Sequence, residues 1–270
     1  MSIFQLVRLK ALLAPLLVAA MALMAGCGSD PKGNDRENVE KLYADARDDL
    51  NTGSYERAIK TLERIEGRAA GTLLAQQAML DMAYAQWKTA ERVQAIATLD
   101  RFIKLHPSSP ALDYALYLKG VVNFIDNMGI LGSLARQNLS ERDQQASRDA
   151  YQAFQQLVEQ FPASKYSADA RLRMDYIVNA LAEHEVHVAR YYYRRGAYLA
   201  AANRAQQTLR DYQQAPAVEE ALYIMAASYE KLGLTALRDD ADRVLKKNFP
   251  SSRFIEGGVR TPERRWWQFW

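Results

Sequence analysis

The chain repeats short helical segments separated by regular turns. The segments AIKTLERI, starting at Ala58, and AIATLDRF, starting at Ala95, align without gaps at an offset of 37 residues. The turns GSYERA, from Gly53, and GAYLAA, from Gly196, are also alike, and HPSS, FPAS and FPSS each follow a helical run. Self-similarity at such a period means that each unit buries its apolar side against its neighbours. The chain is therefore expected to be all-α, with helix pairs stacked in a row.

Each part of the repeat has a structural reason. Ile59, Leu62 and Ile65 are spaced to share one helix face, and a small residue such as Ala58 or Ala201 lets a neighbouring helix approach closely. Glycine at the turns can end the preceding helix in a left-handed conformation, and proline cannot continue a helix. The serines after the prolines are then expected to begin or cap the next segment: Ser109, Ser164 and Ser252.

This period and punctuation are typical of tetratricopeptide repeats, whose unit is about 34 residues. We predict a tetratricopeptide-repeat superhelix of about five helix pairs over residues 38–254. The predicted pairs are 38–51 with 55–66, 73–88 with 91–105, 111–126 with 144–160, 166–194 with 198–212, and 217–231 with 234–248. The third repeat contains an extra loop at 126–143, and loops this long are often functional.

The sequence contains a single cysteine, Cys27, which lies in the stretch LMAGCGSD. Upstream, Arg8 and Lys10 precede an apolar run at 11–25 that is too short for a comfortable membrane span. The stretch resembles the lipobox of bacterial lipoproteins. That resemblance implies a signal peptide at 1–26 that is cleaved, acyl chains such as palmitate on Cys27, and a tether at 27–37. An ordinary signal peptide with an incidental cysteine is the alternative.

Charge and motifs argue against several function classes. The formal net charge is +3, with no clustered basic face to indicate nucleic acid binding. His184 and His187 in EHEVH are three residues apart, whereas zincin-like metal sites need a spacing of four. No catalytic constellation or phosphate-binding glycine loop is evident. We therefore predict no metal site, no cofactor and no enzymatic activity.

Two long segments resemble the BamD (ComL) family of outer-membrane lipoproteins. They are LDRFIKLHPSSPALDYALYLKGVVNF, from Leu99, and RMDYIVNALAEHEVHVARYYYRRGAYLAAANRA, from Arg173. The resemblance implies a lipid-anchored scaffold on the periplasmic face of the outer membrane, within the β-barrel assembly machine. Its implied partners are the periplasmic domain of the barrel-forming subunit, other assembly lipoproteins and unfolded outer-membrane proteins. Gly28, next to the cysteine, also favours the outer membrane. A tetratricopeptide pilotin lipoprotein that escorts a secretin is the alternative.

The resemblance also directs attention to two groups of residues. The candidate contact with the barrel-forming subunit comprises Arg194, Arg195, Asn203 and Arg204. A solvated basic turn is the simpler interpretation of these residues. The candidate substrate groove in the first two repeats comprises Tyr43, Tyr55, Tyr84 and Trp87, of which most are expected to be packing residues. The stretch EGRAAGTLL, from Glu66, departs from the aromatic-proline turn that the family often has there.

An aromatic-rich tail follows the repeats at 255–270. It ends in TPERRWWQFW, whose aromatic residues are Trp266, Trp267, Phe269 and Trp270. Leaving four aromatic side chains in water is costly. They could cap the last repeat, enter the membrane interface, bind a partner, or occupy the substrate groove as a mimic of the aromatic signal that the family is thought to receive.

Overall fold

The computed structural model describes residues 31–124 and 144–257. All regular secondary structure in these two ranges is helical, and eleven helices are formed. Five successive pairs are followed by a short last helix: α2 (Pro31–Asn51) with α3 (Tyr55–Arg68), α4 (Leu73–Lys88) with α5 (Arg92–Leu105), α6 (Leu112–Asn123) with α8 (Gln144–Gln160), α9 (Ser167–Arg194) with α10 (Tyr198–Asp211), α11 (Val218–Lys231) with α12 (Thr235–Asn248), then α13 (Arg253–Gly257). The predicted all-α tetratricopeptide-repeat array of five pairs is confirmed.

The helix bounds differ from the predicted ones at two places. The first helix begins at Pro31 rather than at residue 38, so part of the predicted tether is helical. Proline is accepted in the first turn because the backbone N–H that it lacks would have no partner within the helix. The short helix α13 was not predicted. The predicted loop at 126–143 lies outside the described residues. The two helices of the third pair agree closely with the prediction.

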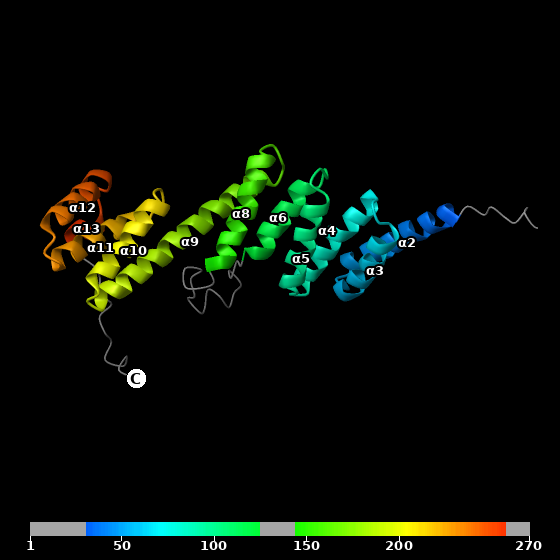
Figure 1. Ribbon diagram of the computed structural model, residues 1–270, viewed down its shortest axis with the longest axis horizontal. Helices are drawn as coiled ribbons and strands as arrows, with labels where there is room; N and C mark the ends of the chain where they lie inside the picture. Colours follow the sequence, from blue (N-terminus) through cyan, green and yellow to red (C-terminus); the bar gives the residue numbers. More distant parts are fainter. Residues whose placement is uncertain (1–30, 125–143, 258–270) are drawn as a thin grey trace, which may run out of the picture.

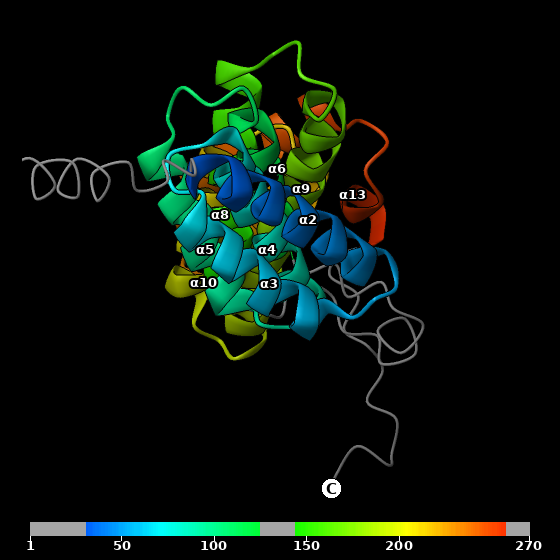
Figure 2. The same cartoon turned by 90° about the vertical axis from the view of Figure 1, so that its right-hand side faces the viewer.

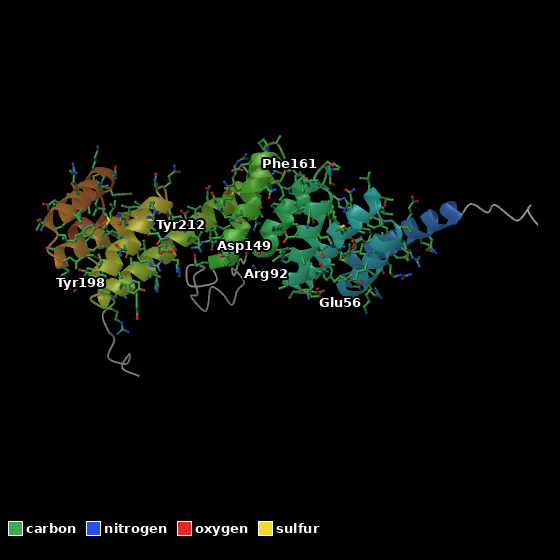
Figure 3. All side chains as sticks on the ribbon, viewed as in Figure 1. Glu56, Arg92, Asp149, Phe161, Tyr198 and Tyr212 are labelled. Atoms are coloured by element: carbon green, nitrogen blue, oxygen red, sulfur yellow. The ribbon has the colours of Figure 1, made fainter. Side chains whose placement is uncertain are left out.

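The pairs lie side by side in chain order, so the molecule is elongated (Figure 1). Seen along its length, the array places α2 in front of the helices that follow (Figure 2). The second helix of a pair starts on one long edge, where Glu56, Arg92 and Tyr198 lie, whereas Phe161 lies on the opposite edge (Figure 3). No helix in the described ranges is long and apolar enough to cross a membrane.

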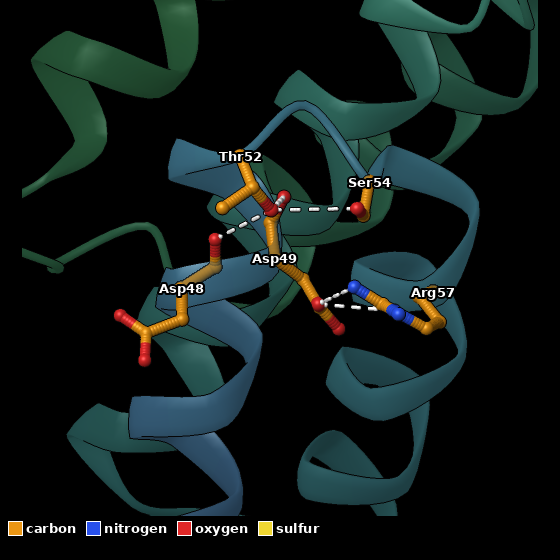
Figure 4. Close-up of polar contacts among 5 residues, drawn as sticks. All are labelled: Asp48, Asp49, Thr52, Ser54 and Arg57. Atoms are coloured by element: carbon orange, nitrogen blue, oxygen red, sulfur yellow. Dashed lines mark hydrogen bonds and ion pairs between the residues drawn. The ribbon is translucent and has the colours of Figure 1, made fainter.

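Glycine and polar contacts shape the turns between helices, and Figure 4 shows the polar contacts at the first turn. Gly53 has φ +77° and Gly196 has φ +78°, the left-handed conformation that ends a helix. Thr52 Oγ1 donates a hydrogen bond of 2.9 Å to the Asp48 carbonyl, which helps to close α2. Arg57 Nη2 lies 2.5 Å from Asp49 Oδ1 and so ties the start of α3 to the end of α2.

Ala90 takes the place of the turn glycine in the second repeat. It lies 37 residues after Gly53, the same offset that relates the two repeats, and its φ is +64°. Among the described residues, Ala90 is the only one other than glycine whose φ is positive. A Cβ atom makes this conformation unfavourable by about 1–2 kcal/mol. The second repeat therefore keeps the shape of the turn at a cost in stability.

The serines after the prolines hold the turns between repeats. The Oγ atoms of Ser109, Ser164 and Ser252 each accept a hydrogen bond from the backbone N–H two residues later, at 3.2–3.3 Å. Ser252 therefore caps α13, as predicted, whereas Ser109 and Ser164 cap the turn before the next helix. Ser109 Oγ also donates to Gln76 Oε1 at 2.8 Å, and Ser164 Oγ donates to Asp113 Oδ2 at 2.6 Å. Each of these two turns is thereby fixed to the first helix of the preceding repeat.

The core is a series of local clusters, each shared between a helix pair and its neighbours. Ala58, Ala95 and Ala201 are fully buried, which confirms that the repeat needs a small residue at this position. Because each repeat packs only against those beside it, the first helices form a continuous row along the molecule. That row carries the side chains described next.

Candidate binding surface

Three of the four predicted groove residues are in contact. Tyr55, at the start of α3, lies with its ring centroid 6.3 Å from that of Tyr84 on α4, and Tyr84 lies 5.9 Å from Trp87. Both pairs are edge to face, the arrangement that aromatic quadrupoles favour. Lys88 Nζ lies 5.3 Å from the Trp87 ring centroid and 5.8 Å from that of Tyr84. We call these three rings the N-terminal aromatic cluster; all of them are half-buried.

Tyr43, the fourth predicted residue, belongs to a polar centre beside this cluster. Its hydroxyl donates a hydrogen bond of 2.7 Å to Asp81 Oδ2 on α4. Asp81 is only 7% exposed and also accepts from Gln77 Nε2 at 3.1 Å, and Arg47 Nη1 lies 3.6 Å from it. Burial raises the pKa of Tyr43, and the hydrogen bond to Asp81 raises it further.

Sequence reasoning missed Asp81. Its signal is the position of a single acidic residue in LLAQQAMLDMAYAQWK, a helix in which most side chains around it are apolar. A buried carboxylate needs hydrogen-bond donors, and Gln77, four residues earlier on α4, supplies one of them. The other donor, Tyr43, comes from 38 residues away and could not be identified from spacing.

A second set of rings continues along the row in the third and fourth repeats. Tyr117 on α6 stacks on Tyr166 with centroids 4.7 Å apart and planes at 18°, and Tyr114 lies 5.5 Å from the same ring. We call these three residues the central aromatic cluster. Burial, followed by the nearby Asp81 carboxylate, raises the pKa of Tyr114 to about 12. The field of Asp81, on α4, therefore reaches the central aromatic cluster.

The central aromatic cluster is tied to a charged pair on α9. Tyr117 Oη donates to Asp169 Oδ2 at 2.7 Å, and Arg173 Nε donates to the same oxygen at 2.6 Å. Burial alone would raise the pKa of Asp169, but the hydrogen bonds from Arg173 and Tyr117 outweigh it and lower that pKa. Arg173 also lies over the Phe124 ring, 5.1 Å from its centroid. Beside it Tyr176 is 41% exposed, so aromatic surface is accessible here.

The four residues of the predicted partner contact are not one cluster. Arg194 and Arg195 end α9, and Arg195 Cζ lies 5.4 Å from the ring centroid of Tyr191. Arg204 on α10 instead pairs with Glu185, Nη1 to Oε2 at 3.0 Å. Glu185 precedes Arg195 by ten residues on α9, about 15 Å of helix.

Arg204 therefore has an intramolecular role that the sequence did not indicate. Glu185 is 5% exposed, so its charge requires a partner within the protein. The Arg204 side chain is 42% exposed, and Asn203 beside it is exposed. Both could still reach a partner from the outer side of α10.

The predicted lipidation site and the aromatic residues of the predicted tail are not among the described residues. These are Cys27, Trp266, Trp267, Phe269 and Trp270. Within the described ranges, no group of three histidine, cysteine, aspartate or glutamate residues could hold a metal ion.

Comparison with known proteins gives a consistent result. A family model described as "YfiO: Outer membrane lipoprotein" matches residues 35–245. The outer membrane protein assembly factor BamD of Neisseria meningitidis serogroup B is 47% identical over 255 residues, which cover 94% of this chain and 96% of that protein. BamD of Haemophilus influenzae is 37% identical over 232 residues, covering 86% and 88%.

Among solved structures, a crystal structure of TPR-like repeats of a putative kinesin light chain covers 79% of this chain and 97% of its own. Its TM-score is 0.35 at 13% identity, which is too low to carry an argument about function.

Proposed function

The chain belongs to the YfiO family of outer membrane lipoproteins, which includes BamD, and from this premise we propose that it is an outer membrane protein assembly factor. In detail, we propose a scaffold rather than an enzyme, held by lipid on Cys27 at the periplasmic face of the outer membrane. It would bind the barrel-forming subunit of the assembly machine and unfolded outer-membrane proteins.

The observation that supports substrate binding best is the row of aromatic and polar groups, most of which lie on the first helices of the pairs. It runs from the N-terminal aromatic cluster past Asp81 to the central aromatic cluster and Arg173. An extended peptide presents alternate side chains to one side, so aromatic residues at every second position can meet successive rings. Lys88 and Arg173 supply positive charge beside those rings.

The proposed contact with the barrel-forming subunit lies at the other end of the array. Arg194 and Arg195 are exposed at the turn between α9 and α10, and Asn203 is exposed on α10. Guanidinium groups can pair with carboxylates through two hydrogen bonds, so an acidic surface is the fitting partner. Because Arg204 already neutralises Glu185, we assign the leading role in this contact to the other three residues.

A peptide-binding assay tests the substrate site. Substituting both Tyr84→Ser and Trp87→Ser should weaken binding of a peptide that ends in alternating aromatic residues by about tenfold, since buried aromatic contacts dominate such sites. Tyr229→Ser, on α11 and also half-buried, is the matched control and should leave the affinity unchanged. Circular dichroism checks that each variant is folded. Equal loss in the control, or no loss in the double variant, would contradict the proposed site.

Depletion of the protein in its own bacterium tests the overall function. Quantitative proteomics of the outer membrane should show a broad fall in β-barrel proteins. Loss of a single secretin, with the other barrels intact, would instead identify the chain as a pilotin and overturn the proposal.

A further inference from the structure

A hollow of about 400 Å³ lies near the end of the described chain, between α9, α11 and α13. Val186, Ala217 and Phe254 supply apolar surface in it, and Phe254 is held in place by stacking on Tyr223 with centroids 5.5 Å apart. This volume falls in the range of sites that bind small ligands or a few side chains. The hollow belongs to neither aromatic cluster and is separate from Arg194, Arg195 and Asn203.

The described lining of the hollow carries unpaired negative charge. Arg190 and Glu220 neutralise each other through two hydrogen bonds of 2.6 Å. Glu183 and Glu219 also line the hollow, and neither side chain has an ion pair or hydrogen bond with another described residue. Arg253 adds one positive charge to the lining, so its charged groups together leave one excess negative charge. Such carboxylates attract a cationic segment; Glu219 is half-buried, whereas Glu183 is exposed to water.

The last described helix, α13, borders this hollow. Arg253, at the first position of α13, lines the hollow, and Gly257 is the last residue of that helix. Residues four apart lie on the same helix face, so Gly257 lies on the side of α13 that carries Arg253. Arg264 follows Gly257 by seven residues, about 23 Å when extended. The segment that follows therefore reaches any part of the hollow.

We infer that segment 258–270 of this chain folds back into the hollow, with Arg264 and Arg265 against Glu183 and Glu219. The segment contains three arginines and one glutamate, so its charge is opposite to that of the unpaired carboxylates. The aromatic side chains that follow the arginine pair then cover the apolar part of the lining. The segment acts as an internal ligand, and any other peptide must displace it to enter the hollow.

Tryptophan fluorescence can test this in the full chain. The sequence has four tryptophans, of which three lie in the segment and the fourth is Trp87. In a Trp87→Phe background, all tryptophan emission therefore reports on the segment. We expect protection from iodide quenching, which is lost when Glu183→Lys and Glu219→Gln are added, because losing two charge pairs lowers the docking equilibrium about tenfold.

Matched variants make the outcome decisive. Glu63→Lys, on the exposed side of α3, should leave quenching unchanged. Arg264→Glu alone should increase quenching, and combining it with Glu183→Lys should restore protection by exchanging the two charges. Circular dichroism confirms that the helices are retained.

Two results would overturn the inference. In one, the segment is already fully quenched in the parent protein. In the other, it stays protected in the Glu183 and Glu219 variant but loses protection with Asp242→Lys. Asp242 lines a different hollow, of about 360 Å³, between α11, α12 and α13, so that result would place the segment there.

Discussion

Gly120 on α6 offers the sharpest test of how the two helices of a repeat pack. A Cβ atom built on this buried residue would collide with Phe154 Cε1 on α8 and lie 2.6 Å from Cδ1 and 2.7 Å from Cζ. Phe154 is fully buried in the cluster formed by α6, α8 and α9, so its ring has no space to retreat into. We predict that Gly120→Ala destabilises the protein although alanine is the better helix former.

The magnitude follows from two opposing effects. Overpacking a filled core costs about 1–3 kcal/mol, and replacing glycine by alanine inside a helix returns about 1 kcal/mol. The net loss is about 1–2 kcal/mol of unfolding free energy. With a urea dependence of about 2 kcal/mol per molar, the midpoint of unfolding falls by about 0.5–1 M. Urea titration followed by far-ultraviolet circular dichroism measures this shift.

Gly67 near the end of α3 provides the matched control. A Cβ atom there would meet nothing within 4 Å, so Gly67→Ala should be neutral or raise stability by up to about 1 kcal/mol. Adding Phe154→Leu to Gly120→Ala should recover part of the loss, since the smaller side chain makes room for the new methyl group. A Gly120→Ala protein as stable as the parent would refute the close approach of α6 and α8.

The same substitution connects packing to the binding surface. The Phe154 ring lies 6.1 Å from that of Tyr117 and 6.5 Å from that of Phe124. Displacing it should shift both rings. We therefore expect Gly120→Ala to weaken peptide binding as well as stability, and Gly67→Ala to change neither adversely.

Three further predictions concern single contacts. Ala90→Gly should stabilise the protein by about 0.5–1 kcal/mol in urea titration, because glycine adopts φ +64° without strain. Tyr43→Phe should cost about 1.5–3 kcal/mol at neutral pH, because Asp81 loses a donor. Burial and Asp81 raise the pKa of Tyr43 in the folded state. The contribution of Tyr43 to the free energy of unfolding is therefore complete below its ordinary pKa of about 10 and is lost as the pH rises above that value. The difference in unfolding free energy between the parent and Tyr43→Phe should narrow in urea titrations at alkaline pH. Arg204→Ala should lower thermal stability by about 1–3 kcal/mol, because Glu185 is left buried without its cation; an unchanged melting temperature would show that Arg204 serves only an external partner.

The repeat pattern determined the helices and their order because its information is local. Apolar residues three and four apart define a helix face, and glycine and proline mark where the chain must turn. These rules located all five pairs, the long helix Ser167–Arg194 and the left-handed turns at Gly53 and Gly196. The family resemblance, and not these rules, directed attention to Tyr55, Tyr84 and Trp87, which the fold brings into contact.

Contacts between helices, within a repeat and from one repeat to the next, were decided only by the tertiary structure. Tyr43 meets Asp81 across 38 residues, Arg204 meets Glu185 across 19, and Phe154 presses against Gly120 across 34. No periodicity specifies these pairs, since they depend on the angle and rotation at which one helix lies against another. Because each buried polar group and each filled gap has one geometry that satisfies it, these contacts fix how the repeats stack and which side chains remain available for binding.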